Sequence, residues 1–422
     1  MSQLHKQACV LCLLAFWLFM LSACATHSRH GNIAATSTGP LILISIDGLH
    51  PDYLSLAETP ALDRIIDTGV RAEWMEPVFP SFTFPNHYSL VTGLYPAQHG
   101  IVANRMIDPE YDGMFTLGNS KEVANDFWWQ GEPIWVTAEK QGLRSATLFW
   151  PGSEAKIAGH RPSDWLPYQH NLPHSTRIDQ VLTWLDRPID NRPELITLYF
   201  SSVDSAGHRH GPAKPPVIEA LEEVDQHIGR LLDELAQREL LQHSHILIVS
   251  DHGMSQLSPD RRIYLDDYVD REVAKDSLLG PVAFLWPDAD QLEIVEAALR
   301  DAHPAMRIAR PEQLPEHFAF TGHRRIPPLL ALAGDGWLIT HRGPRAPYTT
   351  MLGAHGYDPQ LPSMRTSFFA RSPALLPGRV IAPISVLDVH PLMAHLLNLE
   401  PPESEGDLSV FESVLINPDA VE

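Results

Sequence analysis

The sequence predicts an α/β fold in which helices flank a central, mostly parallel sheet and a smaller cap subdomain is inserted. Short apolar runs recur along the chain, and each is typical of a strand that is buried on both faces. Some of the segments between these runs have helical periodicity, as crossovers between parallel strands require. A less regular stretch, richer in proline and arginine, interrupts this alternation and indicates the insertion.

Four apolar runs are the expected strands of the sheet. They cover residues 41–46, 146–150, 195–200 and 246–250. A first helix is expected after Thr59-Pro60, a pair typical of an N-cap and first helical position, and Gly69 ends it. A second helix is expected before the last strand, because apolar residues at positions 217, 221, 224, 228, 231 and 235 fall on one face.

The length of 422 residues exceeds the usual size of a single core. We expect a catalytic domain at 40–400 with an inserted cap at 256–350. The cap would contain a strand at 282–286 and a helix at 290–300. Residues 401–422 are expected to be an acidic, peripheral tail.

The N-terminus resembles a bacterial lipoprotein signal. Lys6 precedes an apolar run from Ala8 to Leu21, which is shorter than the ~20 residues that a membrane-spanning helix needs. The run ends in Leu-Ser-Ala-Cys, similar to a lipobox, so residues 1–23 would be removed and Cys24 would carry lipid. Residues 24–39 would tether an exported, periplasm-facing protein, to the outer membrane rather than the inner one. The alternative is an ordinary signal peptide with an incidental cysteine.

The cysteine count and the net charge bear on disulfide bonds and on the class of binding partner. Cys9 and Cys12 would leave with the signal and Cys24 would be lipidated, so no disulfide is expected in the mature fold. The formal net charge of −21 argues against a stable nucleic-acid complex, which needs clustered Lys and Arg. It does not exclude a small anionic substrate, because a bound metal inverts the local charge. The oligomeric state is left open.

Three carboxylates follow predicted strands. Asp47 and Asp251 come directly after two of the strands, and Asp204 follows a third within a few residues. In open α/β sheets, ligands bind beyond the carboxyl ends of the strands. Three carboxylates at that edge would repel one another unless cations lay among them.

Histidines accompany these carboxylates. His208 follows Asp204 by four residues, in a segment that Gly207 and Gly211-Pro212 predict to be a loop. His252 is next to Asp251, and His355 lies in a Gly-Ala-His-Gly turn. A mixed set of Asp and His ligands suits zinc better than calcium or magnesium.

A hydroxyl residue near a helix start is the candidate nucleophile. Thr83 precedes Pro85, a favoured first-turn residue, and a helix is expected over 88–94. A helix N-terminus suits a phosphate, and a metal on the hydroxyl would make it a nucleophile. Thr83 could instead be only an N-cap, and Ser81 is the rival nucleophile.

Together these motifs resemble the nucleotide pyrophosphatase/phosphodiesterase family of the alkaline phosphatase superfamily, in a compact bacterial form. The resemblance runs from about residue 41 to 397 and implies an alkaline-phosphatase-like sheet. It rests on five motifs in the family's order, namely Asp47, Thr83-Phe84-Pro85-Asn86-His87, Asp204-x-x-Gly-His208, Asp251-His252-Gly253 and Gly353-Ala354-His355.

The resemblance also implies a cofactor, two zinc ions, and roles for single residues. Asp204, His208 and His355 match the ligands of one ion. Asp47, Thr83, Asp251 and His252 match the ligands of the other. Asn104 matches an asparagine that binds a phosphate oxygen, Phe84 and Tyr199 match aromatic residues around a nucleoside base, and Tyr168 is a further pocket candidate.

The predicted activity is hydrolysis of nucleotide phosphodiester or pyrophosphate bonds through a covalent Thr83 intermediate. A sulfatase is disfavoured, because the segment from Thr83 to His87 lacks that branch's Cys and Arg. A phosphomonoesterase or phosphonate hydrolase on the same metals remains the alternative, followed by a zinc-binding lipoprotein without catalysis. Four further histidines and a tryptophan pair are expected to have supporting, packing or surface roles: His87, His99, His210, His390 and Trp128-Trp129.

Overall fold

The computed structural model describes residues 39–270, 278–343 and 350–416. Cys24, with the signal and almost all of the tether, lies outside these residues, as does the end of the acidic tail. Among the described residues, none of the helices has the length and apolar character needed to cross a membrane.

An eight-stranded sheet forms the centre of the described chain, in the order β18-β2-β17-β9-β1-β8-β6-β7. Strand β1 (Leu41–Ile46) pairs in parallel with β8 (Leu195–Phe200) and β9 (His245–Val249). On one side β8 pairs with β6 (Ser145–Leu148), and β6 with β7 (Asp164–Leu166), both in parallel. The antiparallel strand is β17 (Phe368–Arg371), which joins β9 to β2 (Val70–Ala72), with β18 (Arg379–Ile381) at the edge. The predicted mostly parallel α/β sheet is confirmed.

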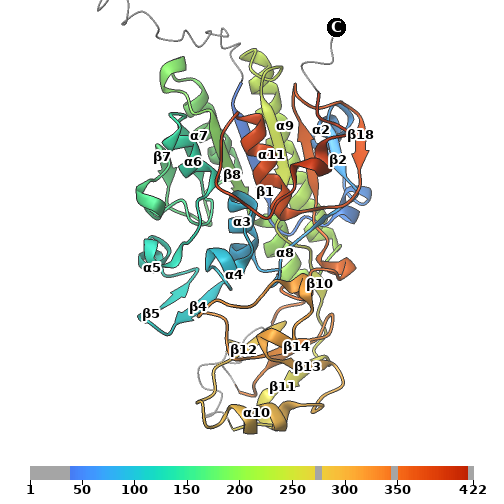
Figure 1. Cartoon of the computed structure of the whole chain (residues 1–422). Helices are drawn as coiled ribbons and strands as arrows, with labels where there is room; N and C mark the ends of the chain where they lie inside the picture. The colour runs from blue at the N-terminus through green and yellow to red at the C-terminus, as the bar shows by residue number, and fades with distance from the viewer. Residues whose placement is uncertain (1–38, 271–277, 344–349, 417–422) are drawn as a thin grey trace, which may run out of the picture. The chain divides into compact units, whose positions relative to one another are not determined.

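Helices cover both faces of this sheet (Figure 1). Ile42, Ile44 and Ile46 of β1 belong to a core shared with α2 (Pro60–Asp67), α7 (His174–Leu185) and α9 (Pro215–Gln237). The alternate residues Leu41 and Leu43 belong to the core of the other face. Helices α3 (Thr83–Thr92), α6 (Ile134–Lys140) and α11 (Val389–Leu396) pack there. Alternation along a strand therefore supplies two cores, which explains why the strands are apolar throughout.

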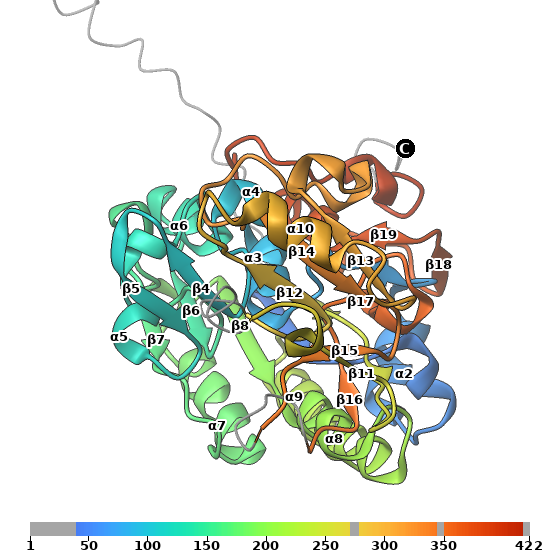
Figure 2. The same ribbon diagram turned by 90° about the horizontal axis from the view of Figure 1, so that it is seen from below.

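A smaller set of strands lies apart from the large sheet, and Figure 2 shows it from below. An antiparallel sheet has the order β12 (Val282–Leu285), β14 (Leu329–Ala333) and β13 (Met306–Ala309). Strands β11 (Arg262–Tyr264) and β15 (Leu338–Thr340) pair in parallel beside α10 (Leu292–Leu299). These elements share a separate core, so the insertion buries apolar surface of its own.

Three local expectations are wrong. The segment with Asp204 and His208 is a helix, α8 (Ser202–His210), rather than a loop. Helix α3 begins at Thr83 instead of position 88, and its N-cap is Phe82. The segment after residue 400 is not wholly peripheral, because Phe411 is completely buried and packs on Phe368.

Candidate metal centre and catalytic pocket

The carboxyl ends of β1, β8 and β9 bring three carboxylates together. Asp47 follows β1, and its amide donates to Phe200 O at 2.9 Å. Asp204 lies in the first turn of α8, and its amide donates to Asp47 O at 3.0 Å. Asp251 follows β9 and is completely buried. Gly48 permits this approach, because it has a φ of +74° and an added Cβ would lie 3.1 Å from Asp204 Cα.

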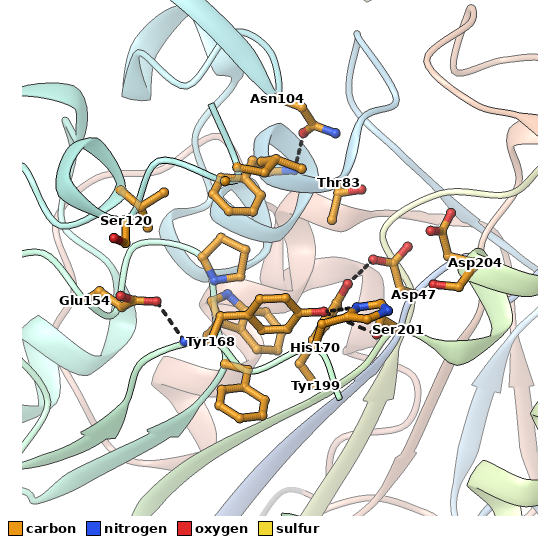
Figure 3. A pocket seen from close by; sticks show the side chains of 18 of the residues that line it. Asp47, Thr83, Asn104, Ser120, Glu154, Tyr168, His170, Tyr199, Ser201 and Asp204 are labelled. Atoms are coloured by element: carbon orange, nitrogen blue, oxygen red, sulfur yellow. Dashed lines mark hydrogen bonds between the residues drawn. The ribbon is translucent and has the colours of Figure 1, made fainter. Parts of the chain in front are cut away.

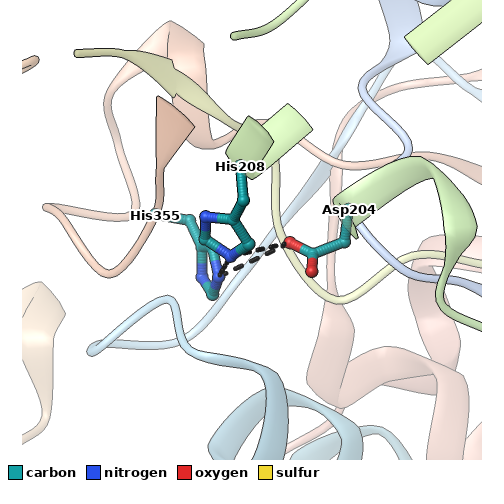
Figure 4. Close-up of side chains that lie close together, drawn as sticks. All are labelled: Asp204, His208 and His355. Atoms are coloured by element: carbon teal, nitrogen blue, oxygen red, sulfur yellow. Dashed lines mark hydrogen bonds and ion pairs between the residues drawn. The ribbon is translucent and has the colours of Figure 1, made fainter. Parts of the chain in front are cut away.

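The first cluster consists of Asp204, His208 and His355 (Figure 4). Their spacing comes from α8, where positions four apart lie on one face, and from the turn after β16 (Gly353–Ala354). His208 Nε2 lies 3.3 Å from Asp204 Oδ1, and His355 Nε2 lies 3.6 Å from the same oxygen. The two Nε2 atoms are 3.2 Å apart.

The tautomers of these histidines are set by backbone carbonyls. His208 Nδ1 lies 2.9 Å from Gly353 O, and His355 Nδ1 lies 2.9 Å from Ser81 O. Each Nδ1 therefore carries the proton and donates, which leaves both Nε2 atoms with lone pairs. Burial also lowers the pKa of His355 well below its ordinary value, which keeps the ring neutral. Two facing lone pairs repel unless a cation lies between them.

A second cluster surrounds His252. Its Nε2 lies 3.3 Å from Asp47 Oδ1 and 3.0 Å from Asp251 Oδ2, while Nδ1 contacts Gly253 O at 2.9 Å. The Thr83 hydroxyl lies 3.3 Å from His252 Nε2. The predicted set of Asp47, Thr83, Asp251 and His252 is thus brought together, although Asp204 also lies within ligand distance of Asp47 and His252.

The bonding of the carboxylates fits a pair of cations. Asp47 Oδ1, Asp204 Oδ1 and Asp251 Oδ2 are buried and have no hydrogen-bond partner in the described part of the chain. Buried polar atoms are almost always bonded, so such oxygens point to an absent ligand. Burial, together with the charges of Asp251 and Asp204, raises the pKa of Asp47 well above its ordinary value. The residues therefore form a cation-binding arrangement of Asp and His, the donor set that zinc prefers.

Thr83 and Asn104 face this centre from α3 and the loop after α4 (Pro96–His99) (Figure 3). Thr83 is the first residue of α3, so its hydroxyl lies at the positive end of that helix. Asn104 Oδ1 accepts from Phe84 N at 2.9 Å, which leaves the Nδ2 hydrogens available to a ligand. Ser81 is different, because its buried hydroxyl donates to Tyr357 O and accepts from Gly356 N.

A cavity of about 550 Å³ extends from the carboxylates. Its aromatic and apolar walls include Phe84, Phe149, Trp150 and Tyr168. Tyr168 is 43% exposed, so its ring is open to a ligand. Glu154, which sequence reasoning did not single out, also lines this cavity and accepts from Tyr168 N at 3.0 Å. Only the fold brings Glu154 here, and no sequence signal marked it.

Tyr199 lines the same cavity in a different way. It is 8% exposed, and its hydroxyl donates to Asp47 Oδ2 at 2.5 Å. Its ring packs edge-on against His87 and Tyr168. The side chain therefore holds a carboxylate of the metal centre as well as lining the wall.

The remaining histidines and tryptophans are buried apart from His210, and His87 lies within ligand distance of Asp47 and Asp251. His87 is buried, with Nε2 2.7 Å from Ser45 Oγ and Nδ1 2.9 Å from Thr83 O and 3.3 Å from Asp251. His99 is buried and contacts Ser89 Oγ. The other members of the expected set divide by exposure: His390, Trp128 and Trp129 are buried, and His210 is exposed.

Comparison with known proteins identifies relatives of this chain. The model of the family "Type I phosphodiesterase / nucleotide pyrophosphatase" matches residues 41–358. A bis(5'-adenosyl)-triphosphatase of Xenopus laevis is 37% identical over 399 residues, which are 93% of this chain and 85% of that protein. Human ectonucleotide pyrophosphatase/phosphodiesterase family member 1 is 36% identical over 91% of this chain, but the match spans only 43% of that longer protein.

The fold is also similar to solved structures. Mouse ectonucleotide pyrophosphatase/phosphodiesterase 5 superposes with a TM-score of 0.84 and 32% identity over 89% of this chain and all of that one. An inactive variant of the mouse protein, with a threonine replaced by alanine, has been solved in complex with AMP. It matches with the same TM-score over 90% of this chain.

Proposed function

Because the chain belongs to the type I phosphodiesterase/nucleotide pyrophosphatase family, we propose that it is a zinc-dependent hydrolase that attacks nucleotide phosphorus through Thr83. The enzyme class and the hydrolysis of phosphodiester bonds follow from the family. The zinc ions, their number and the covalent intermediate are our proposal. The observation that carries it is the cluster of orphaned carboxylate oxygens and imidazole nitrogens, of which His252 Nε2 lies 3.3 Å from the Thr83 hydroxyl.

The metal ligands would form two sets. Asp204, His208 and His355 would hold one ion. Asp47, Asp251 and His252 would hold the other, together with the Thr83 hydroxyl. When bound, two zinc ions would lower the pKa of the hydroxyl and stabilise charge on the entering and leaving oxygens.

Thr83 would act as the nucleophile. After losing its proton to water, its Oγ would form a bond to phosphorus while the bond to the leaving oxygen breaks, which gives a phosphothreonyl ester. Water would then displace Thr83 and restore the free hydroxyl. Two in-line displacements predict net retention at phosphorus, so inversion of a chiral phosphorothioate diester would contradict this scheme.

The other pocket residues would position the substrate. Asn104 would donate from Nδ2 to a nonbridging oxygen, where one such donor is worth ~10²–10³ in rate. Phe84 and the exposed ring of Tyr168 would stack on a nucleoside base. A nucleotide substrate is supported by the AMP complex of the mouse relative and by the name of the frog triphosphatase.

Diesters and pyrophosphates are preferred over phosphate monoesters in this proposal. A monoester carries one more charged oxygen, which calls for an additional cationic side chain. Among the described residues that line the catalytic cavity, none is Lys or Arg. The phosphomonoesterase alternative therefore lacks a partner for the extra charge.

The test compares a chromogenic thymidine diester with the matching monoester, using zinc-loaded protein. We expect a strong preference for the diester, lost on chelation and reduced by roughly three orders of magnitude or more in Thr83→Ala. Thr68→Ala is the matched control. Thr68 is exposed at the end of α2, and its replacement by alanine removes the same hydroxyl group. A preference for the monoester would move the protein to the phosphatase alternative.

We also propose that Cys24 carries a lipid anchor in a periplasm-facing lipoprotein. The support is the Leu-Ser-Ala-Cys sequence at the end of the apolar run. Cys24→Ser should release the protein from the membrane fraction into the soluble fraction. Equal membrane association of both forms would contradict the anchor.

A further inference from the structure

A second cavity shares a wall with the catalytic pocket. It has a volume of about 300 Å³ and lies between the first turn of α7, residues 216–223 of α9 and the length of α8. His170, Ser201 and Ser205 line both cavities, and Ser205 directly follows Asp204 of the metal centre. Figure 3 shows His170 and Ser201 on the side of the pocket away from Asn104. The second cavity therefore adjoins the catalytic pocket on the side of Asp204.

The two cavities differ in charge. In the described structure, the catalytic cavity is lined by the acids Asp47, Glu154 and Asp204 and by no Lys or Arg. The second cavity has one acid, Glu223, against two arginines, Arg177 and Arg209, whereas each cavity has three histidines in its wall. Such a donor-rich wall is unusual in a chain with a formal net charge of −21.

Two of these side chains have nitrogen atoms without a hydrogen-bond partner among the described residues. Arg209 is exposed and its Nε donates to Ser205 O at 3.0 Å, while its other N–H groups have no partner among the described residues. His174 Nε2 lies 3.2 Å from Ser202 Oγ, and its buried Nδ1 has no partner within the described ranges. Burial lowers the pKa of His174 to about 4, so the ring is neutral at pH 7 and adds no positive charge to the cavity.

Arg177 contributes charge rather than hydrogen bonds. Its guanidinium is buried and donates to the carbonyls of Leu172, Tyr199 and His170. Carbonyls leave the positive charge uncompensated, and α7 adds the positive end of its dipole at His174. The cavity thus has a fixed positive wall, and the exposed Arg209 side chain is available for a bidentate contact.

We propose that this cavity is a subsite for a second phosphate group of the substrate, beyond the phosphorus that Thr83 attacks. The inference rests on the proposed function, because it concerns the same substrate. The second phosphate could belong to the leaving group, as in a dinucleoside triphosphate. It could also be a 3'-phosphate on the ribose of the attacked nucleotide. Both place a dianionic or monoanionic phosphate next to the scissile group.

The test measures KM with three probes. One is the adenosine 5'-(4-nitrophenyl) phosphodiester, which has a single phosphate. The second is diadenosine triphosphate, and the third is the 4-nitrophenyl diester of adenosine that also carries a 3'-phosphate. The readout is the KM of each probe with more than one phosphate divided by the KM of the single-phosphate probe, so general effects on the metal centre cancel.

We expect Arg209→Gln to raise this ratio roughly tenfold for one of the two probes, because a charge-assisted hydrogen bond is lost. The probe that responds identifies the source of the second phosphate. Glu223→Gln should lower the same ratio, because it removes the acid of the cavity. Arg379→Gln is the matched control, with the same change of charge on the exposed edge strand β18.

An unchanged ratio in Arg209→Gln, both for diadenosine triphosphate and for the 3'-phosphorylated probe, would overturn the subsite alone if the wild type hydrolyses the single-phosphate probe. An equal change in Arg379→Gln would also overturn it, because the effect would then be long-range electrostatics. If the wild type hydrolyses none of the three probes, the proposed function fails, and the subsite with it.

Discussion

Two buried charge clusters in this molecule have opposite bonding. Around Asp108, Arg325 Nε donates to Oδ2 at 2.6 Å and Arg324 Nε donates to Oδ1 at 2.9 Å. The remaining N–H groups of Arg325 donate to the carbonyls of Gly100, Trp128 and Phe127. Around Asp47, in contrast, three carboxylates meet and each has a buried oxygen without a hydrogen bond.

Missing hydrogen-bond partners, rather than burial of charge, distinguish the candidate functional site from the structural cluster. Asp47 and Asp108 are equally buried, at 1% and 3% exposure, so burial of charge does not distinguish them. What distinguishes them is whether the chain supplies the partners. The Asp108 cluster is complete, and it ties the segment before β14 to the segments around β4 (Arg105–Asp108). The Asp47 cluster is incomplete and needs cations from outside.

The distinction between the two clusters is tested most directly by the same substitution, Asp to Asn, in each of them. Asp47→Asn should lower activity by about three orders of magnitude, since it removes a metal ligand. It should not lower the melting temperature of the chelated protein, because it relieves repulsion among three carboxylates. Asp108→Asn should destabilise the chelated protein by about 3–5 kcal/mol, because it leaves Arg325 buried without its counterion.

Thermal unfolding in chelator and again with added zinc measures both variants. The wild type and Asp108→Asn should gain stability on adding zinc, whereas Asp47→Asn should gain much less. Equal losses of stability for both variants in chelator would contradict the distinction between a complete and an incomplete cluster.

Acid sensitivity offers a second, smaller test. Although burial alone would raise it, hydrogen bonds from Arg324 and Arg325 lower the pKa of Asp108 to about 2. A carboxyl whose pKa is depressed in the folded state contributes stability above its unfolded pKa of about 3.9, and the contribution is lost as pH falls toward the folded value. The loss between pH 4 and 2 should be about 2 kcal/mol.

Urea unfolding of the chelated protein across this range provides the measurement. The difference in stability between the wild type and Asp108→Asn should be constant above pH 5 and should shrink as the pH falls from 4 to 2. A difference that stays constant down to pH 2 would show that the ion pair is not the source of the stability.

Two carboxylates of the candidate metal centre could be placed from the sequence because they follow strands. Asp47 and Asp251 lie where apolar runs end. Ligands of open α/β sheets bind beyond the carboxyl ends of the strands, and the local sequence is enough to locate these ends. The helix around Asp204 was missed because Gly207, a poor helix former, precedes Gly211-Pro212. A Cβ at position 207 would lie 2.9 Å from Met254 Cε, so a larger residue there would require that flexible side chain to shift.

Features that depend on residues far apart in the sequence could not be predicted. The Asp108–Arg325 bond joins residues 217 positions apart, and no local pattern marks either partner. The second cavity likewise draws its wall from three helices. For Tyr199, the sequence predicted a role beside the base, whereas the register of β1 and β8 places it opposite Ser45 and brings its hydroxyl to Asp47.

Tyr199→Phe is the mildest test of the incomplete cluster, because it removes a single hydrogen-bond partner of Asp47. If the hydroxyl orients Asp47, activity and zinc affinity should each fall by roughly 10–100-fold, the usual cost of losing a group that supports a metal ligand. If Tyr199 serves only as an aromatic wall, phenylalanine should retain both. Tyr88→Phe is the matched control, since Tyr88 is fully buried and its hydroxyl has no partner among the described residues. Zinc titration with a competing chelator separates the two roles, because stacking on a base affects KM for nucleotides but leaves metal affinity unchanged.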